Sequence, residues 1–432
     1  MKIKVRNSTY AEVMAKPPFP RFSPQKPGLF FRTLTYLAGL PELKGTRFTC
    51  TRKGMEQLKK GQPCLYLMNH SGFIDLKIAA HILYPHPFQI VCTQDGFIGK
   101  LWLMKHLGCI PKKKFVPETA LIRDMLYAFR TLHTSVLMYP EASYSFDGTA
   151  TPLPDSLGRC LKLLGVPVIM IRTHGAFLHD PLYNGLQQRK VKVSAEMEYL
   201  LSPQQIAQST PEQLNAVLRE AFDVDYFRWQ QENRVAVTEP FRTDHLHRVL
   251  YKCPVCGSEE GMHGAGTRLT CRACGHTWEL DEYGRLNDLS GGSAFAHIPD
   301  WYAWERECVR RELNDGTYRL TCDVDILMAV DYRSIYRVGS GTLIHDRQGF
   351  RLTGCDGQLS FSRSPLASYS LYADYHWYEL GDVICLSDEK RSYYCFPKDR
   401  SIAVAKARIA TEELYKRAKA AQGTQKETSV AK

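Results

Sequence analysis

A short apolar run that leads into a histidine and an aspartate constrains this chain more than any other feature. The run Cys64–Met68 predicts a buried β-strand, and residues 74–84 predict the helix that follows it. His70 and Asp75 lie on either side of the turn between these two elements. Residues five apart in a regular helix point about 140° away from each other, so the two side chains can meet only if His70 lies in the turn. Gly72 makes such a turn easy.

A histidine next to an aspartate is typical of a general base and the partner that orients it. A neighbouring carboxylate fixes which ring nitrogen of a histidine is free and keeps its pKa near the working pH. His70 would take a proton from a hydroxyl group, while Asp75 would hold the imidazole and stabilise its charged form. The alternative interpretation is a capped helix start with an ordinary surface histidine.

Three downstream segments bear on the choice between these interpretations. Residues 108–114 lead from a short apolar stretch into the lysines at positions 112 to 114. Residues 136–143 predict a strand that ends in a Pro-Glu turn, and residues 165–171 predict another buried strand. Lysine ammonium groups serve well as point charges for phosphate, so the lysine cluster is a candidate site for an anionic head group.

In their order and spacing, the four segments resemble the motif blocks of the glycerolipid acyltransferase family, which includes the lysophosphatidate acyltransferases. The resemblance covers roughly residues 45–235 and implies an α/β acyltransferase domain. It implies transfer of a fatty acyl group, in phospholipid biosynthesis, from an acyl carrier protein or coenzyme A thioester to the hydroxyl of a lysophospholipid such as lysophosphatidate. The family's catalytic pair matches His70 and Asp75. The blocks that bind the acceptor contain Lys112, Lys114, Glu141 and Ser143.

One departure from the family pattern bears on the acceptor. The family usually follows the matched glutamate with Gly-Thr-Arg, whereas this chain has Ala142-Ser143-Tyr144. The missing arginine would be a planar, bidentate phosphate ligand. We therefore expect lysine contacts to a phosphate-bearing acceptor, and two alternatives stay open. The acceptor could be a non-glycerophosphate lysolipid, or the domain could be an inactive membrane scaffold.

Two C-x2-C pairs predict a zinc ribbon over residues 246–285. Its four candidate ligands are Cys253, Cys256, Cys271 and Cys274. Four thiolates complete a tetrahedral zinc site with no open position for water, which predicts a structural metal. His263 and His276 are the spare candidates. Because this segment has no strong basic excess, we do not expect it to bind nucleic acid.

The rest of the chain predicts a mainly β domain. Residues 296–420 combine a linking amphipathic helix, short alternating runs separated by glycines, and a final helix. This arrangement resembles a pleckstrin-homology-like barrel, which implies a module that binds a membrane or a partner. The predicted order is a basic amphipathic N-terminal region (1–44), the acyltransferase domain (45–240), the zinc ribbon (246–285), the β domain (296–420) and a disordered tail (421–432).

Charge and hydropathy predict a peripheral membrane protein. The chain carries a net charge of +11, and residues 1–60 hold 13 basic side chains against three acidic ones. An apolar stripe at helical spacing within this region is typical of an interfacial helix on anionic lipid, and packing onto the acyltransferase domain is the alternative. The stripe consists of Phe30, Phe31, Leu34, Leu37 and Ala38. No apolar run is long enough to span a bilayer and no secretion signal is evident, so we expect a cytoplasmic protein on the inner face of the membrane, with reduced cysteines.

Overall fold

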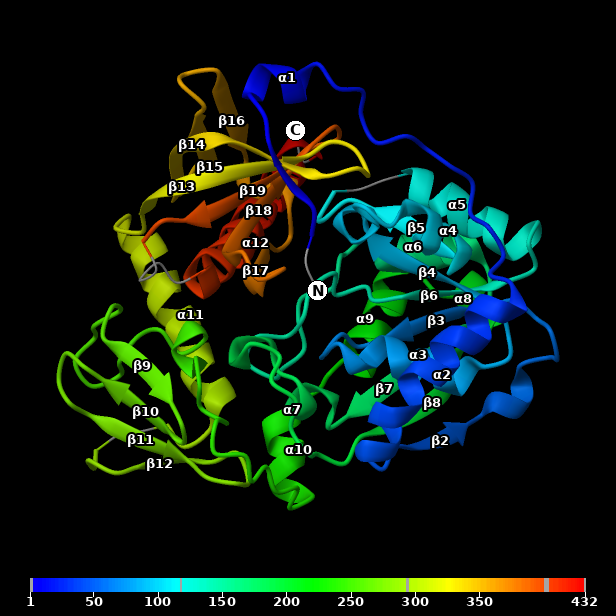
Figure 1. Ribbon diagram of the computed structural model, residues 1–432, viewed down its shortest axis with the longest axis horizontal. Coiled ribbons are helices and arrows are strands. Elements are labelled where there is room, and N and C mark those ends of the chain that lie inside the picture. Colours follow the sequence, from blue (N-terminus) through cyan, green and yellow to red (C-terminus); the bar gives the residue numbers. More distant parts are fainter. Residues whose placement is uncertain (1–2, 117–118, 293–294, 400–403, 431–432) are drawn as a thin grey trace.

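The computed structural model describes residues 3–116, 119–292, 295–399 and 404–430, with side chains as far as residue 422 in the last segment. The described chain contains three sheets (Figure 1). The sheet of the N-terminal half lies on one side of the molecule, and the ribbon and the C-terminal sheet lie on the other. The long helix α11 (Ile298–Asp315) runs from the ribbon to the C-terminal sheet.

The N-terminal half is built on a seven-stranded sheet in the order β2-β8-β7-β3-β6-β4-β5. Its strands are β2 (Thr49–Lys53), β3 (Leu65–Met68), β4 (Phe88–Thr93), β5 (Cys109–Lys112), β6 (Ser135–Met138), β7 (Val168–His174) and β8 (Ser194–Leu201). The five strands from β7 to β5 run parallel, whereas β8 is antiparallel to β7. Parallel strands bring their carboxyl ends to one edge of the sheet, and the loops that follow β3, β4, β5 and β6 therefore meet there.

Helices cover this sheet because both of its faces are apolar. Alternate residues of β3 enter two different cores, with Tyr66 and Met68 on one side and Leu65 and Leu67 on the other. Such a continuous apolar run is typical of parallel strands buried on both faces. The helices of this half are α2 (Leu29–Gly45), α3 (Ile74–Leu83), α4 (Leu101–His106), α5 (Thr119–Arg130), α6 (Leu157–Leu164), α7 (Ala176–His179), α8 (Pro203–Gln208), α9 (Pro211–Ala221) and α10 (Tyr226–Glu232). The predicted strand, turn and helix at β3 and α3 are thus confirmed.

The ribbon is a small antiparallel sheet packed against α11. Its strands are β9 (Met262–Ala265), β10 (Arg268–Cys271), β11 (Thr277–Leu280) and β12 (Leu286–Asp288), in the order β12-β11-β10-β9. The rings of Trp278 and Trp301 lie 4.8 Å apart, and the indole nitrogen of Trp301 donates to the carbonyl of Lys252 at 3.0 Å. Buried Glu305 of α11 accepts from the backbone nitrogen of Lys252 at 2.8 Å, so α11 holds the start of the ribbon through polar contacts as well as packing.

The C-terminal domain consists of two antiparallel meanders and a long helix. The first contains β13 (Leu320–Ala329), β14 (Ile335–Asp346), β15 (Gly349–Gly354) and β16 (Leu359–Arg363). The second contains β17 (Tyr372–Trp377), β18 (Gly381–Ser387) and β19 (Ser392–Pro397). Pairing of β13 with β19 joins them in the order β16-β15-β14-β13-β19-β18-β17. The expected mainly β character is confirmed, and the pleckstrin-homology-like barrel stays a prediction.

The two ends of the chain differ from the predicted domain limits. Strand β1 (Val5–Asn7) pairs in parallel with residues 335–337 of β14, so it belongs to the C-terminal sheet and not to a separate N-terminal region. That edge of β14 is open because β15 pairs only with residues 341–346. After the short helix α1 (Tyr10–Met14), the chain crosses to α2 at the other side of the molecule (Figure 1).

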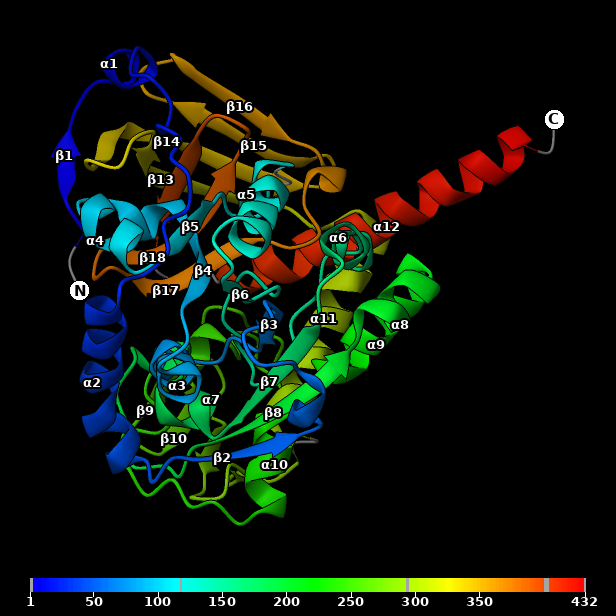
Figure 2. The same cartoon turned by 90° about the vertical axis from the view of Figure 1, so that its right-hand side faces the viewer.

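Helix α12 (Val404–Val430) extends away from the C-terminal sheet and through most of the predicted disordered tail (Figure 2). Residues 421–430 include alanine, glutamine, lysine and glutamate, which have high helix propensity and continue the preceding helix. The last two residues of the predicted tail lie outside the described residues.

Candidate functional site

The His70–Asp75 pair forms in the turn between β3 and α3. The Nδ1 atom of His70 lies 3.1 Å from the Oδ2 atom of Asp75. That oxygen also accepts hydrogen bonds from the backbone nitrogens of Ser71 at 2.7 Å and Gly72 at 3.1 Å. The carboxylate is therefore held at the start of α3 independently of the imidazole. Because Nδ1 faces this acceptor, Nε2 is the ring nitrogen left to accept a proton.

Two tyrosines enclose the imidazole of His70. The ring of Tyr139 stacks on it with centroids 4.2 Å apart, and the ring of Tyr144 lies 4.0 Å away at a tilt. The side chain of His70 nevertheless keeps 22% of its surface exposed. Tyr144 also stacks on the exposed ring of Phe73, with centroids 5.5 Å apart. The packed rings of Phe73 and Tyr144 therefore extend from the molecular surface to His70.

Glu141 supports the turn through hydrogen bonds, and its carboxylate is buried. Its Oε2 atom accepts from the backbone nitrogen of His70 at 2.7 Å. Its Oε1 atom accepts from the backbone nitrogen of Thr151 at 3.0 Å and from the Thr151 hydroxyl at 2.9 Å. Burial raises the pKa of Glu141, and the hydrogen bonds from Thr151 and His70 oppose that rise. Ser143, also predicted to bind the acceptor, is buried near this loop.

Two more polar side chains tie the turn to its neighbours. The Oδ1 atom of Asn69 accepts from the backbone nitrogen of Thr173 on β7 at 2.9 Å, and its amide nitrogen donates to the Thr173 hydroxyl at 2.9 Å. The hydroxyls of Ser71 and Tyr226 lie 2.7 Å apart, and Tyr226 begins α10. The turn is thus connected to both the sheet and the helix behind it.

Asp180 is a neighbour of the site that the sequence analysis missed. Its Oδ2 atom accepts from the backbone nitrogen of Phe73 at 3.0 Å, and a methyl group on Gly72 would lie only 2.1 Å from its Oδ1 atom. Burial raises the pKa of Asp180 to about 7, an effect that nearby His179 opposes and Asp75 strengthens. Asp180 closely follows β7, the neighbour of β3. Because residues after neighbouring parallel strands lie at the same edge of the sheet, this position was the signal that could have predicted Asp180 beside the turn.

The predicted lysine cluster lies along the end of β5, and its members have separate surroundings. Lys112 donates to the carbonyl of Val116 at 3.2 Å, and Lys113 contacts the carbonyl of Glu389 in the C-terminal domain. Lys114 is buried and forms an ion pair with Asp95, the two atoms lying 2.6 Å apart. Lys114 therefore does not present its ammonium group to solvent.

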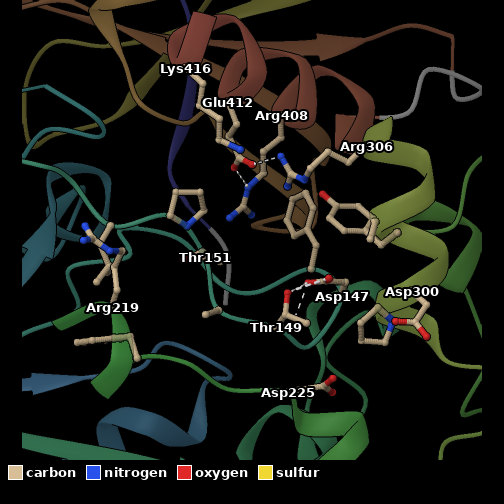
Figure 3. A pocket seen from close by; sticks show the side chains of 18 residues that line it. Asp147, Thr149, Thr151, Arg219, Asp225, Asp300, Arg306, Arg408, Glu412 and Lys416 are labelled. Carbon is tan, nitrogen blue, oxygen red and sulfur yellow. Dashed lines mark hydrogen bonds and ion pairs between the residues drawn. The ribbon is translucent and has the colours of Figure 1, made fainter. Parts of the chain in front are cut away.

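A separate cavity of about 520 Å³ lies between residues 146–153 and the helices α11 and α12 (Figure 3). Residues 146–153 form one wall and helices α11 and α12 form another. Arg306 and Arg408 reach into it, and both pair with Glu412, at 2.8 and 3.3 Å. His70 does not line the cavity. The cavity is linked to the His70 turn through Thr151, which lines the cavity and donates to Glu141.

The four ribbon cysteines converge as their spacing predicts. Their Sγ atoms all lie within 4.8 Å of one another; those of Cys253 and Cys274 are 3.8 Å apart and those of Cys256 and Cys271 are 3.7 Å apart. A tetrahedron with zinc–sulfur bonds of about 2.3 Å has sulfur atoms about 3.8 Å apart, so the group fits zinc.

The backbone around these cysteines has the shape of two tight knuckles. Gly257 and Gly275 have positive φ angles and donate to the carbonyls of Cys253 and Cys271 at 2.9 and 2.7 Å. The spare candidates point elsewhere, because His276 contacts Asp288 at 2.8 Å and His263 stacks on His247.

These observations define a class of protein: an α/β domain with a histidine–carboxylate pair at the carboxyl edge of its sheet, joined to a four-cysteine ribbon and a β domain. The acyltransferase family model matches residues 49–173, which contain that pair. Over these residues the chain is therefore similar to the acyltransferases.

Two relatives show the extent of the similarity. The chloroplastic 1-acyl-sn-glycerol-3-phosphate acyltransferase BAT2 of Brassica napus is 26% identical over 129 residues, which are 28% of this chain and 36% of that protein. The chain thus spans little more than a third of the length of this curated relative. The crystal structure of the 1-acyl-sn-glycerophosphate acyltransferase PlsC from Thermotoga maritima is 15% identical, with a TM-score of 0.35, over 44% of this chain and 76% of that one. No helix among the described residues is long and apolar enough to cross a membrane.

Proposed function

We propose that the protein is an O-acyltransferase that moves a fatty acyl group from an acyl thioester to the hydroxyl of a lysolipid. The observation that carries this proposal is the His70–Asp75 contact of 3.1 Å in the β3–α3 turn, within the region that the acyltransferase family model matches. The same contact argues against an inactive scaffold, because a domain without catalytic activity does not require an oriented and solvent-accessible imidazole.

The proposed chemistry needs one base and no nucleophile from the protein. His70 Nε2 removes the acceptor's hydroxyl proton as the oxygen attacks the thioester carbonyl, and Asp75 stabilises the imidazolium that forms. The tetrahedral intermediate then loses the thiolate, which takes the proton from His70. Two cysteines of this domain are poorly suited to act as nucleophiles, because burial raises the pKa of Cys64 and contact with Cys92 together with burial raises that of Cys109.

For the acceptor we propose a lysophospholipid such as lysophosphatidate, and for the donor an acyl carrier protein or coenzyme A thioester. The name of the curated relative and the position of Lys112 at the end of β5 support this choice. One observation favours a non-glycerophosphate lysolipid instead: Lys114 is paired with Asp95 and buried, and Glu141 and Ser143 are buried as well. The two candidate acceptors therefore differ in whether their head group carries a glycerol phosphate.

We also propose that α2 contacts the membrane. The predicted stripe is exposed on the surface, with Phe30 71% and Leu37 54% accessible, which favours an interfacial helix over a core helix. Exposed Trp102 on α4 packs edge-on against Phe31, with ring centroids 5.7 Å apart, and extends the same apolar surface. The exposure of these residues supports our proposal that the protein is peripheral, on the cytoplasmic face of an anionic membrane.

One assay tests the chemistry and the acceptor together. Purified protein is given an acyl carrier protein thioester or an acyl coenzyme A, with lysophosphatidate, other lysophospholipids or amino-acid-linked lysolipids. Free thiol and acylated product are measured by colorimetry and mass spectrometry. Thiol release that requires lysophosphatidate supports the main proposal. Release only with a phosphate-free acceptor would replace the acceptor and keep the chemistry, and no release with any acceptor would reject the acyltransferase.

A further inference from the structure

The ammonium group of Lys114 sits in a closed cage. Its side chain is only 3% exposed, and Asp95 lies against it at 2.6 Å. The Nζ atom is 3.1 Å from the ring centre of Tyr372, 5.4 Å from that of Tyr394 and 5.6 Å from that of Trp377. Tyr372 and Trp377 belong to β17 and Tyr394 to β19, so the C-terminal domain supplies all three rings.

The ammonium group of Lys114 already has a carboxylate partner without a ligand. Asp374 of β17 is also buried near Lys114, and its Oδ2 atom accepts from the hydroxyl of Tyr372 at 2.6 Å. Lys114 is thus paired with Asp95 of the acyltransferase domain and interacts electrostatically with Asp374 of the C-terminal domain. An anionic group could reach the ammonium only by displacing Asp95 or the aromatic rings. Cation–π contacts of this kind gain strength when they are desolvated, so the buried cage favours the closed arrangement.

Further contacts continue from the cage to the catalytic turn. Arg363 donates to the carbonyl of Phe115 at 2.8 Å, beside Lys114 in the chain. The ring of Tyr369 packs against that of Phe115, with centroids 5.2 Å apart. Arg408 of α12 donates at 3.1 Å to the carbonyl of Tyr144, whose ring lies against His70. The β domain therefore touches the loops after both β5 and β6.

We propose that Lys114 is a positioning residue that fastens the C-terminal β domain onto the acyltransferase domain, so that the β domain forms a fixed wall beside the catalytic turn. The effect on acyl transfer rests on the proposed function, whereas the domain contact does not. On this view Lys114 is not a ligand of the acceptor phosphate. The β domain is then needed for the geometry of the active site and is more than a separate binding module.

Hydrogen exchange of the full-length protein without lipid tests the contact. In Lys114→Met, we expect exchange in β17 and in residues 109–116 to be about tenfold faster than in the wild type, while β14 and β15 keep the wild-type rate. The control is Lys16→Met, because Lys16 lies 4.9 Å from the ring centre of Tyr336 in the same domain and is only partly buried. This control should leave exchange unchanged throughout.

A second variant covers the case in which Lys114→Met fails to fold because Asp95 is left unpaired. The double variant Lys114→Met/Asp95→Asn removes both charges, so we expect it to fold and still to show faster exchange in β17. Unchanged exchange in the folded variant would overturn the proposal, whether or not the wild type transfers acyl groups. This readout is therefore independent of the proposed function.

Kinetics then separate a positioning residue from a phosphate ligand. Loss of the wall should lower kcat by a similar factor for phosphate-bearing and phosphate-free acceptors that the wild type uses, with little change in KM. A selective rise in the KM for lysophosphatidate, with kcat and hydrogen exchange unchanged, would identify Lys114 as a ligand and overturn the proposal. Faster exchange with unchanged kcat would also overturn it, because the wall would then be dispensable.

Discussion

At the scale of single residues, the site depends on a turn in which most polar atoms have a partner. Asp75 accepts from two backbone nitrogens as well as facing His70, and Glu141 accepts from the backbone of His70 itself. These bonds position the imidazole before any substrate arrives, which is how a base avoids reorganisation during the reaction. The stacked rings of Tyr139 and Tyr144 restrict its rotation further.

Substitution of the catalytic pair tests this arrangement. We expect His70→Ala to reduce acyl transfer by about 10²- to 10⁴-fold or more, because a positioned base contributes that much. Asp75→Asn should also lower the rate, since an amide can favour the wrong imidazole tautomer. Thiol release and product mass are the measurements, with melting temperature and zinc content as controls for folding. A His70→Ala variant within tenfold of the wild type would reject the general base.

At the scale of elements, we expect the ribbon to depend on a bound zinc more than on its small core. Four short strands bury few side chains of their own, and the cysteines join two knuckles that are 18 residues apart in the sequence, from Cys253 to Cys271. A metal that binds only the folded form contributes its binding free energy to folding. Glu305 and Trp301 then connect the ribbon to α11.

Zinc removal is therefore expected to loosen the ribbon without removing a group from the catalytic turn. Metal analysis should find about one zinc per chain. Cys253→Ser should lower the metal content and the melting temperature, and hydrogen exchange should rise in β9 to β12 first. A metal-free protein with an unchanged ribbon, in which added zinc switches catalysis on, would contradict the structural assignment.

The C-terminal domain contains a buried histidine that makes its stability depend on pH. His345 of β14 stacks on Phe350, with ring centroids 3.7 Å apart, and its Nδ1 atom lies 2.9 Å from the hydroxyl of Tyr318. Burial lowers the pKa of His345 to about 3. The unfolded chain, with an ordinary histidine pKa near 6.5, binds more protons than the folded one between about pH 6.5 and 3.

The neutral, buried form of His345 therefore stabilises the domain fully above pH 6.5, and this stability is lost as the pH falls towards 3. Between pH 7 and pH 5 the loss should be about 2 kcal/mol. His345→Asn keeps an acceptor for Tyr318 and cannot titrate, so its free energy of unfolding should fall less over this range. Denaturant titrations of the two proteins at both pH values measure the difference, and equal pH dependence would refute the assignment.

At the scale of the whole molecule, we expect the exposed apolar surface of α2 and the basic N-terminal segment to bind a membrane together. Both apolar burial and anionic lipid contribute to binding at an interface, and the electrostatic part is screened by salt. Helix α2 also packs on α3, and Lys77 of α3 contacts Glu42 of α2. A membrane contact through α2 would therefore lie next to the helix that carries Asp75.

Vesicle binding tests this orientation without disturbing the core. Phe30→Ser/Leu37→Ser should weaken binding to anionic vesicles by about a hundredfold or more, because each of the two exposed side chains would lose roughly 1.5 kcal/mol or more of burial in lipid. The control is Leu163→Ser on α6, a leucine that is 61% exposed elsewhere on the surface. Binding of the wild type should fall with salt. Equal binding by the double variant and the control would move the membrane contact to another surface.

The sequence by itself determined the parts of this protein that depend on local spacing. The turn that holds His70 and Asp75, the helix after it and each of the two cysteine knuckles follow from distances of a few residues, which backbone geometry converts directly into positions. Tertiary structure decided the rest, because those contacts join residues far apart in the chain. Glu141 meets the backbone of His70 across 71 positions, and β1 pairs with β14 near the opposite end. From the sequence, Lys114 was expected to be available to an anionic head group. The aromatic rings that enclose it are more than 250 residues away in the chain, and only the tertiary fold brings them to Lys114.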